Sequence, residues 1–128
     1  MVPQNCKYTQ DHEWIKQEEG VYAVGVTDFA QEQLGDITYV ELPEEGATVS
    51  KGEAVGMVES VKAASDVYAP VGGKVAAVNA ALEDQPELVN QSPYEDGWFF
   101  KLEGVKAAEL DALMDAAAYE AFLEEQQE

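Results

Sequence analysis

Short apolar segments that end at a proline or a glycine recur along this chain, and they restrict it to folds built mainly from β-strands. The pattern V-x-x-P-x-x-G occurs over 40–46 and again over 67–73, an offset of 27 residues. In each copy a strand-like run meets a proline, which cannot donate to a sheet, and then a glycine, which permits an unusual backbone angle. Two copies are too few for a solenoid. The repeat therefore predicts a β-sandwich of two similar halves related by a pseudo-two-fold axis, with chance similarity as the alternative.

The spacing of the other apolar residues predicts the remaining strands and the helical regions. Strands are expected at 13–16, 21–26, 37–42, 54–60, 67–69, 74–79 and 98–103. The first two of these form an N-terminal hairpin. Thr27 or Asp28 caps a short helix near 28–34 that ends at Gly35. The segment 83–97 is expected to be a long loop because it holds several turn-forming residues.

The C-terminal region changes to a helical period. Its apolar residues recur at spacings of three and four and predict a stripe that packs onto the sheet, made of Leu110, Leu113, Met114, Ala117, Ala121 and Phe122. Asp115 can cap a second piece, so the segment at about 107–125 is either one helix or two. Together these elements fit a single domain over 1–128 with its core at about 21–103.

The charge of the chain is strongly negative, because 26 acidic residues and 7 lysines give a formal net charge of −19. This excludes a general nucleic-acid binder, which needs clustered cations, and it disfavours binding to anionic membranes. It favours a monomer and partners with basic docking faces. The apolar runs are far shorter than the ~20 residues of a membrane span, and no signal-peptide core is found. We expect a soluble cytoplasmic protein, or one of the mitochondrial matrix if a transit peptide has been removed.

Few groups in the chain could do chemistry of their own: it has one cysteine, one histidine and no arginine. A single thiol excludes an intramolecular disulfide, and Cys6 is expected to be inert near a loose terminus. His12 precedes Glu13, but a zinc-protease motif needs a second histidine, so we expect no metal site and a structural hydrogen bond from His12. Without a nucleophile–base pair or a phosphate-binding loop, the sequence does not predict an enzyme.

Lys62 lies between the two copies of the repeat, where a tight turn between strands is expected. A solvated surface lysine is the commonest situation for this residue type. A Schiff-base lysine needs burial or neighbouring cations, whereas Glu59 and Asp66 are acidic and favour the protonated amine. An attachment point for a carrier cofactor suits an exposed turn, because the modifying enzyme supplies the activated acyl group. These three interpretations compete on the residues alone.

The longer sequence context favours the attachment point. Around the lysine it reads Glu59-Ser60-Val61-Lys62-Ala63 and then Ser65-Asp66-Val67-Tyr68-Ala69-Pro70. This run strongly resembles the lipoylation site of the H-protein family of the glycine cleavage system. Further matches follow in the family's order from about Tyr8 to the C-terminal helix: His12-Glu13-Trp14, Val24-Gly25-Val26-Thr27, Ala30-Gln31, Leu34-Gly35-Asp36-Ile37, Val40-Glu41-Leu42-Pro43, Asn79, Leu82, Pro86, Leu88, Asn90, Pro93-Tyr94 and Gly97-Trp98. One departure is at 116–118, where similar proteins often carry glycine and this chain has alanines.

The resemblance implies a mainly β fold of the lipoyl/biotinyl type, a barrel-sandwich hybrid with small α elements. It implies lipoate in amide linkage on Lys62, as N6-lipoyllysine, with a recognition context of Glu59, Ser60, Val61, Ala63, Ser65 and Asp66. Such a protein is not an enzyme but a shuttle for the aminomethyl group of glycine. Its partners are glycine decarboxylase (P-protein), aminomethyltransferase (T-protein), dihydrolipoamide dehydrogenase (L-protein) and a lipoate-attaching enzyme. Candidate contacts for the loaded, cationic arm are Glu13, Glu59 and Asp66.

Other carriers fit the sequence less well. Biotinyl domains typically flank their lysine with methionines, whereas Lys62 lies between Val61 and Ala63. Lipoyl domains of 2-oxo-acid dehydrogenases usually have an aspartate before the lysine, and they lack the N-terminal hairpin and the C-terminal helix. An H-like protein that donates lipoyl groups to other carriers remains the alternative function.

Overall fold

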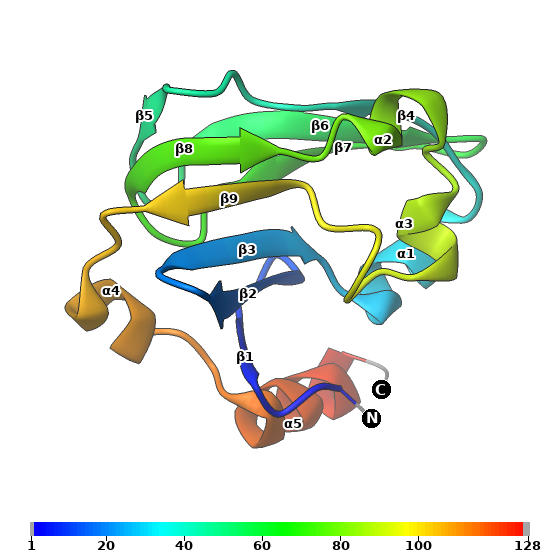
Figure 1. Cartoon of the computed structure of the whole chain (residues 1–128). Coiled ribbons are helices and arrows are strands. Elements are labelled where there is room, and N and C mark those ends of the chain that lie inside the picture. Colours follow the sequence, from blue (N-terminus) through cyan, green and yellow to red (C-terminus); the bar gives the residue numbers. More distant parts are fainter. Residues whose placement is uncertain (1, 127–128) are drawn as a thin grey trace.

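The computed structural model describes residues 2–126, which form two antiparallel sheets. Residues 1, 127 and 128 of the domain expected from the sequence lie outside this part. The larger sheet has the order β1-β2-β3-β9-β8-β5 and the smaller one β4-β6-β7. The strands are β1 (Cys6–Tyr8), β2 (Glu13–Glu18), β3 (Val21–Val26), β4 (Ile37–Glu41), β5 (Thr48–Val49), β6 (Ala54–Ser60), β7 (Ala64–Tyr68), β8 (Gly73–Val78) and β9 (Phe100–Glu103). In Figure 1, β6 and β7 pass behind β8 and β9, so the sheets form the two layers of a sandwich.

Short helices surround the sandwich. They are α1 (Asp28–Leu34), α2 (Ala81–Asp84), α3 (Leu88–Gln91), α4 (Ala107–Asp111) and α5 (Ala116–Gln126). Figure 1 shows α1, α2 and α3 gathered at one end of the sandwich, α4 near the other end, and α5 beneath β1. None of the helices in the described part of the chain is long and apolar enough to cross a lipid bilayer.

Mainly β-branched side chains fill the space between the sheets. Val40, Val58 and Val67 enter this core from the smaller sheet, and Val24 and Leu102 enter from the larger one. Each of the five is at most 3% exposed. Branched side chains suit a pleated surface, and full burial of one contributes about 1.5–3 kcal/mol. The two valines of the repeated pattern thus anchor β4 and β7, the strands on either side of β6.

The two glycines of the repeat play different roles. Gly46 has a φ of 88°, as the sequence predicted for both copies. Gly73 is not among the glycines with positive φ, so this part of the prediction is wrong. A Cβ at Gly73 would instead lie 2.8 Å from the carbonyl oxygen of Glu103 on the neighbouring strand. The pseudo-two-fold relation between the copies stays a prediction.

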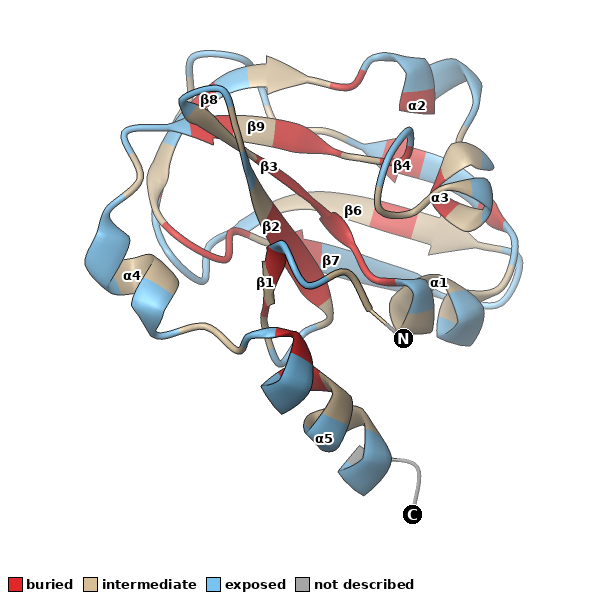
Figure 2. Ribbon diagram, turned by 60° about the horizontal axis from the view of Figure 1, so that its bottom comes forward, coloured by how far each residue is buried: buried red, intermediate tan, exposed pale blue. Residues whose placement is uncertain are grey.

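A second apolar cluster lies on the other face of β1 and β2. Trp14 precedes Ile15 of the main core, so the two side chains point to opposite faces of the sheet. Tyr119 of α5 covers this face, and its ring stacks on Tyr8 with 4.6 Å between the centroids and 8° between the planes. In Figure 2 the start of α5 is coloured as buried where it lies below β1. The C-terminal helix is therefore part of the fold.

Most of the strands and the first helix expected from the sequence are confirmed. Ala54–Ser60 has the predicted bounds, and the Thr27 hydroxyl caps α1 by accepting the N–H of Ala30 at 3.3 Å. β7 begins at Ala64, earlier than predicted, because its first three residues are exposed and carry no apolar signal. β9 begins only at Phe100, and the preceding Phe99 is also buried, so the expected alternation fails there.

The expectation of a loose N-terminus at Cys6 is wrong. Cys6 is 4% exposed and pairs with Lys16 in the ladder between β1 and β2. Burial also raises the pKa of the Cys6 thiol, which keeps it protonated. The strand has only three residues, too few to show a period of two in the sequence.

The loop predicted over 83–97 is wrong for part of its length. It includes the end of α2 and all of α3, each a single turn of helix. The turns are anchored by Leu82 and Val89, which are both fully buried. A single helical turn holds too few residues to show a helical period, so the turn-forming residues dominated the prediction.

The C-terminal segment consists of two helices, and Asp115 separates them. Its carboxylate accepts a backbone N–H of the first turn of α5 at 2.8 Å, which makes it the N-cap. Ala117 and Ala121 are exposed, so the predicted stripe is wrong at these positions. Ala116 and Tyr119 are buried instead, because the new helix begins at 116 and changes the phase of the pattern.

Candidate functional site

The turn that carries Lys62 joins β6 to β7 and is closed by the serine at the end of β6. The backbone N–H of Ser60 donates to the carbonyl of Ala63 at 2.8 Å. The Ser60 hydroxyl accepts the N–H groups of Lys62 and Ala63 at 3.2 and 3.1 Å. A serine hydroxyl can serve in this way where a tight turn leaves backbone donors without a strand partner. Lys62 is therefore fixed through its backbone, and its side chain is exposed at the tip of the turn.

The corner between α1 and β4 supports this turn. The N–H of Val61 donates to the carbonyl of Asp36 at 3.2 Å. Gly35 ends α1 with a φ of 83°, and a Cβ built on it would lie 3.0 Å from Cε of Lys62. The aliphatic stem of the lysine thus passes directly over this glycine. Glycine suits this position for two reasons: it adopts the positive φ, and it leaves room for the stem of Lys62.

The hairpin places most of the predicted recognition residues around Lys62. Val61 is 70% exposed, an unusual value for a large apolar side chain. Ala63, Ser65 and Asp66 are exposed as well. Glu59 is half-buried and pairs with Ala64 directly beside the turn. An enzyme that binds this hairpin would meet one exposed apolar side chain and two carboxylates on the same hairpin as the amine.

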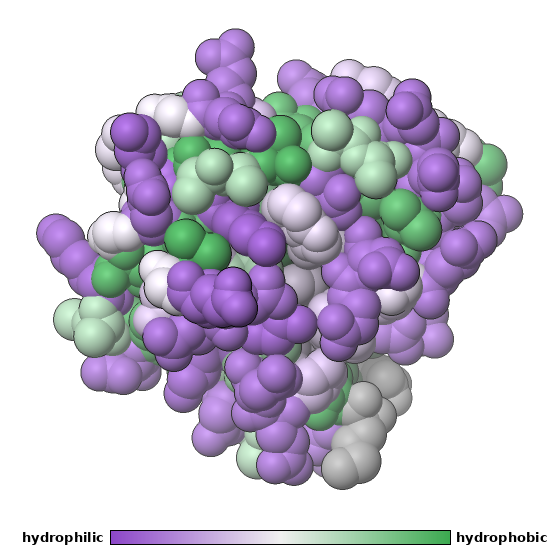
Figure 3. Space-filling view, viewed as in Figure 1, coloured by the Kyte–Doolittle hydropathy of each residue, from purple (hydrophilic) through white to green (hydrophobic). Residues whose placement is uncertain are grey.

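Charge is distributed unevenly between the sheets. The described strands of the smaller sheet contain no lysine, and their acidic residues are Glu41, Glu59 and Asp66. Lysines on the larger sheet are Lys7, Lys16, Lys74 and Lys101. Figure 3 shows that hydrophilic side chains cover most of the visible face, with hydrophobic ones in small patches between them.

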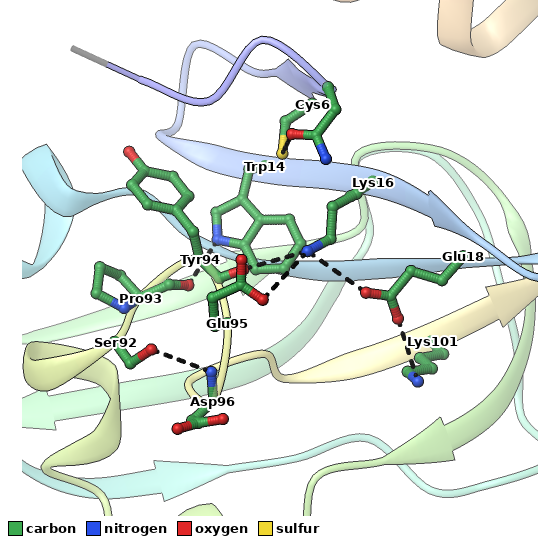
Figure 4. Close-up of polar contacts among 11 residues, drawn as sticks. Cys6, Trp14, Lys16, Glu18, Ser92, Pro93, Tyr94, Glu95, Asp96 and Lys101 are labelled. Atoms are coloured by element: carbon green, nitrogen blue, oxygen red, sulfur yellow. Dashed lines mark hydrogen bonds and ion pairs between the residues drawn. The ribbon is translucent and has the colours of Figure 1, made fainter.

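Two lysines of the larger sheet are engaged in contacts within the protein. Lys16 Nζ lies 3.4 Å from a carboxylate oxygen of Glu18 and 3.8 Å from one of Glu95. It also lies 5.6 Å from the ring centroid of Trp14. The other oxygen of Glu18 lies 3.2 Å from Lys101 Nζ, as Figure 4 shows. The amines of Lys16 and Lys101 therefore help to hold β2, β9 and the 92–96 segment together. Lys62 lies elsewhere, on the exposed turn of the hairpin.

A cavity of about 260 Å³ opens at the far end of β7 from the turn. Its walls come from four segments: the 8–13 region, the turn at Lys51 and Gly52, the end of β7, and the linker between α4 and α5. The linker is held in place by Met114, which exchanges two backbone hydrogen bonds with Tyr8 at 2.8 and 3.0 Å. Lys51, Tyr68 and Leu113 also line the cavity, and nothing in their sequence context marks them as neighbours.

Glu13 lies against this cavity and is only 2% exposed. Its carboxylate accepts hydrogen bonds from the Thr9 hydroxyl at 2.8 Å and from the N–H of Tyr68 at 3.0 Å. Burial raises the pKa of Glu13 to about 7, although both hydrogen bonds act to lower it. The structure brings Glu59 and Asp66 to the lysine hairpin, but it places Glu13 beyond Asp66, beside the end of β7.

His12 makes the structural hydrogen bond that the sequence predicted. Its Nδ1 lies 2.8 Å from the hydroxyl of Tyr119. Its ring also contacts Phe29 and Phe122, with centroids 4.6 and 5.8 Å away. Within residues 2–126, no group of histidine, cysteine and acidic side chains is arranged to hold a metal ion.

Two packed antiparallel sheets that present a lysine on a hairpin turn define a lipoyl-type β-sandwich. The chain belongs to the glycine cleavage H-protein family, whose family model matches residues 6–126. A glycine cleavage system H protein of Listeria monocytogenes is 56% identical over 123 residues, which cover 96% of this chain and 98% of that protein. One of Salmonella arizonae is 56% identical over 126 residues, 98% of each chain.

A solved structure supports the same assignment. The crystal structure of a glycine cleavage system H protein from Mycobacterium marinum matches with a TM-score of 0.86 and 38% sequence identity. The match covers 95% of this chain and 98% of that one. Both the mainly β fold and the family expected from the sequence are thereby confirmed.

Proposed function

We propose that the chain is a single lipoyl-carrier domain over 1–128, with no catalytic residues of its own, and that Lys62 bears lipoate as N6-lipoyllysine. The observation that carries the proposal is the turn itself. Its hydrogen bonds are made by Ser60 and the main chain, so acylation of the exposed amine removes none of the bonds described there. The match to the H-protein family supports the same lysine.

The residues present fit such a group. The chain has one thiol, that of Cys6, and it is buried, so the polypeptide cannot supply a dithiol. When attached, the lipoyl group supplies the disulfide and dithiol chemistry by which an aminomethyl group is accepted and released. The protein contributes an anchor and a docking surface, which raise the effective concentration of the arm at a partner's active site.

The order of partners follows from the family. Glycine decarboxylase (P-protein) would load the arm, aminomethyltransferase (T-protein) would unload it, and dihydrolipoamide dehydrogenase (L-protein) would reoxidise it. Attachment by a lipoate-attaching enzyme would be guided by Val61 and the carboxylates of Glu59 and Asp66, with Ser60, Ala63 and Ser65 shaping the turn. The uneven charge of the smaller sheet supports partners whose docking faces are basic.

Glu13 and Asp66 of the carrier would hold the cationic group of a loaded arm between partners. From the turn, β7 leads past the exposed Asp66 to Tyr68 at the cavity that contains Glu13. An aminomethyl group is cationic when protonated, and a carboxylate favours it. With a pKa of about 7, Glu13 is about half ionised at neutral pH, and an arriving cation would favour its charged form. The carrier would thus shelter its cargo between partners.

Donation of lipoyl groups to other carriers is the alternative function. The same exposed lysine would serve donation, so the hairpin does not distinguish a shuttle from a lipoyl donor. Exchange of the glycine carboxyl group with labelled bicarbonate in the presence of purified P-protein does. A shuttle supports this exchange, and a donor-only protein does not.

Mass analysis tests the attachment directly. We expect a lipoyl increment on the peptide that contains Lys62 after incubation with a lipoate-attaching enzyme. Lys62→Arg should keep the fold and abolish both the increment and the glycine exchange, while Lys74→Arg, an exposed lysine on β8, should change neither. A lipoyl group on another lysine, or full exchange by Lys62→Arg, would refute the assignment.

A further inference from the structure

Helix α1 is weakly anchored by its own side chains. None of the seven residues that the structure describes in it is fully buried. The residues that follow its C-terminal end nevertheless support the lysine turn. Gly35 lies beneath the stem of Lys62, and the carbonyl of Asp36 accepts the N–H of Val61. Ala30 and Leu34 pack against the main core only partly buried, so contacts from outside the helix add to the support of this corner.

Asn90 of α3 makes three hydrogen bonds to that corner. Its side-chain NH2 donates to the carbonyl of Gly35 and to the side-chain oxygen of Gln31, both at 2.9 Å. Its side-chain oxygen accepts the N–H of Ile37 at 2.8 Å. The partners comprise two acceptors and one donor, so the set fits an amide in one orientation. The amide joins the end of α1 to the start of β4 on both sides of Asp36.

The backbone of Asn90 is itself held firmly. The preceding Val89 is fully buried in the main core. Gly97 packs closely against α3, and a Cβ at this glycine would lie 2.8 Å from the carbonyl oxygens of Leu88 and Ser92. The single turn of α3 is thus locked between the core and the 92–97 segment, and its asparagine is a fixed reference point for the corner.

We infer that Asn90 is a positioning residue for the acylation of Lys62. It acts through the Gly35–Ile37 corner, which holds Val61 by a hydrogen bond and lies under the lysine stem. The inference rests on the proposed function of Lys62. Asn90 touches neither the amine nor an incoming acyl group, so its contribution is to limit the positions that the amine occupies before attack.

Asn90→Asp is the sharpest variant, because it keeps the size of the side chain and the acceptor for Ile37 but loses both donations. Asn79, just before α2, provides a control: its side-chain NH2 also donates twice, at 2.8 Å, to the carbonyls of Asp96 and Trp98. Asn79→Asp loses the same number of bonds, and none of them is made to Gln31, Gly35 or Ile37. Both variants should lower the denaturant concentration at the unfolding midpoint to a similar extent, because each leaves two acceptors without their donor.

The first measurement is the rate of Lys62 acylation by a purified lipoate-attaching enzyme with lipoate and ATP, at a temperature where each variant is folded. We expect Asn90→Asp to lower kcat/KM about tenfold, mainly through KM, and Asn79→Asp to stay within about twofold of the wild type. Equal rates for the two variants would overturn the inference. If the wild type is not acylated at all, the proposed function of Lys62 fails instead.

The second measurement does not depend on acylation. Hydrogen exchange of the Val61 amide reports the bond to Asp36 directly. We expect fast exchange in Asn90→Asp and protection in both the wild type and Asn79→Asp, whereas protection in all three would contradict the role of Asn90. Should Asn90→Asp not fold, Gln31→Ala removes one partner of the amide and tests the same corner with a smaller effect, about twofold on kcat/KM.

Discussion

The hydroxyl of Tyr119 lies 2.7 Å from the hydroxyl of Thr27, which joins the C-terminal helix to the N-cap of α1 across 92 positions of sequence. The same phenol oxygen lies 2.8 Å from Nδ1 of His12. Helix α1 is thus held at its start by a side chain of α5 and at its end by Asn90 of α3. The support of the lysine turn depends on both ends of this short helix.

Tyr119→Phe should destabilise the protein by about 1–2 kcal/mol, because it leaves the buried Thr27 and the half-buried His12 without the hydroxyl. The ring and its stacking on Tyr8 are kept, so the loss reports the hydrogen bonds. Chemical denaturation measures the effect. Tyr39→Phe removes an exposed hydroxyl from a side chain that is 48% exposed, and it should change stability by less than ~0.5 kcal/mol. If the two variants are equally stable, the hydrogen bonds of the Tyr119 hydroxyl do not stabilise the fold as expected.

The buried Glu13 should make stability depend on pH. Its pKa is about 7 in the folded protein, above its ordinary value of 4.5, so folding favours the neutral form. The wild type should therefore lose stability relative to Glu13→Gln as the pH rises from about 4.5 to 7, by on the order of 3 kcal/mol in total. Denaturation of both proteins at pH 4.5, 6 and 8 tests this. Glu13→Gln also alters a hydrogen bond, but that offset is the same at every pH, so a constant difference would count against a raised pKa.

Loss of the aminomethyl group from the loaded arm should be faster without the acidic contacts. Asp66→Asn should shorten the lifetime of the loaded carrier about fivefold, since one ion contact near water is worth ~1 kcal/mol. Glu13→Gln should shorten it above pH 7 and have less effect below, where the wild-type carboxyl is mostly protonated. Glu45→Gln, at an exposed acid that does not line the cavity, should leave the lifetime unchanged. Mass analysis over time follows the decay, and equal lifetimes for all four proteins would exclude these contacts.

Ser60→Ala should loosen the lysine turn. It removes the hydroxyl that accepts the N–H groups of Lys62 and Ala63, and we expect a loss of about 0.5–1.5 kcal/mol together with faster amide exchange at both residues. Ser65→Ala is the matched control, because that hydroxyl is exposed and contacts only the carbonyl of Asp66, at 3.4 Å. If exchange at Lys62 is the same in both variants, the hydroxyl of Ser60 does not close the turn.

The sequence predicted those parts of the fold whose signals are local. The strand at 54–60 begins with an uninterrupted run of five apolar or small residues, and the cap at Thr27 and the stop at Gly35 flank a single short helix. β1 and α3 were missed because three or four residues show no period, and tertiary contacts stabilise them. Their existence follows from the core, which only the folded chain reveals.

The candidate site, too, could be predicted from the sequence only in part. Lys62 and its acidic neighbours are contiguous in the sequence, so a turn with an exposed amine could be predicted from them. The corner beneath it could not be, since Asn90 meets its partners across 53 to 59 positions. The burial of Glu13 was equally hidden, because its cavity is assembled from segments near 10, 50, 70 and 113.

The described strands of the smaller sheet contain no lysine, and this affects how copies of the protein interact at high concentration. Acylation of Lys62 would neutralise the one cation of the hairpin, so two molecules that approach tip to tip would present like charges and repel each other at close range. Thiol–disulfide exchange between the arms of neighbouring copies, which would mix loaded and empty carriers, would thereby be disfavoured. The aminomethyl cargo would thus be kept for partner enzymes whose docking faces are positively charged.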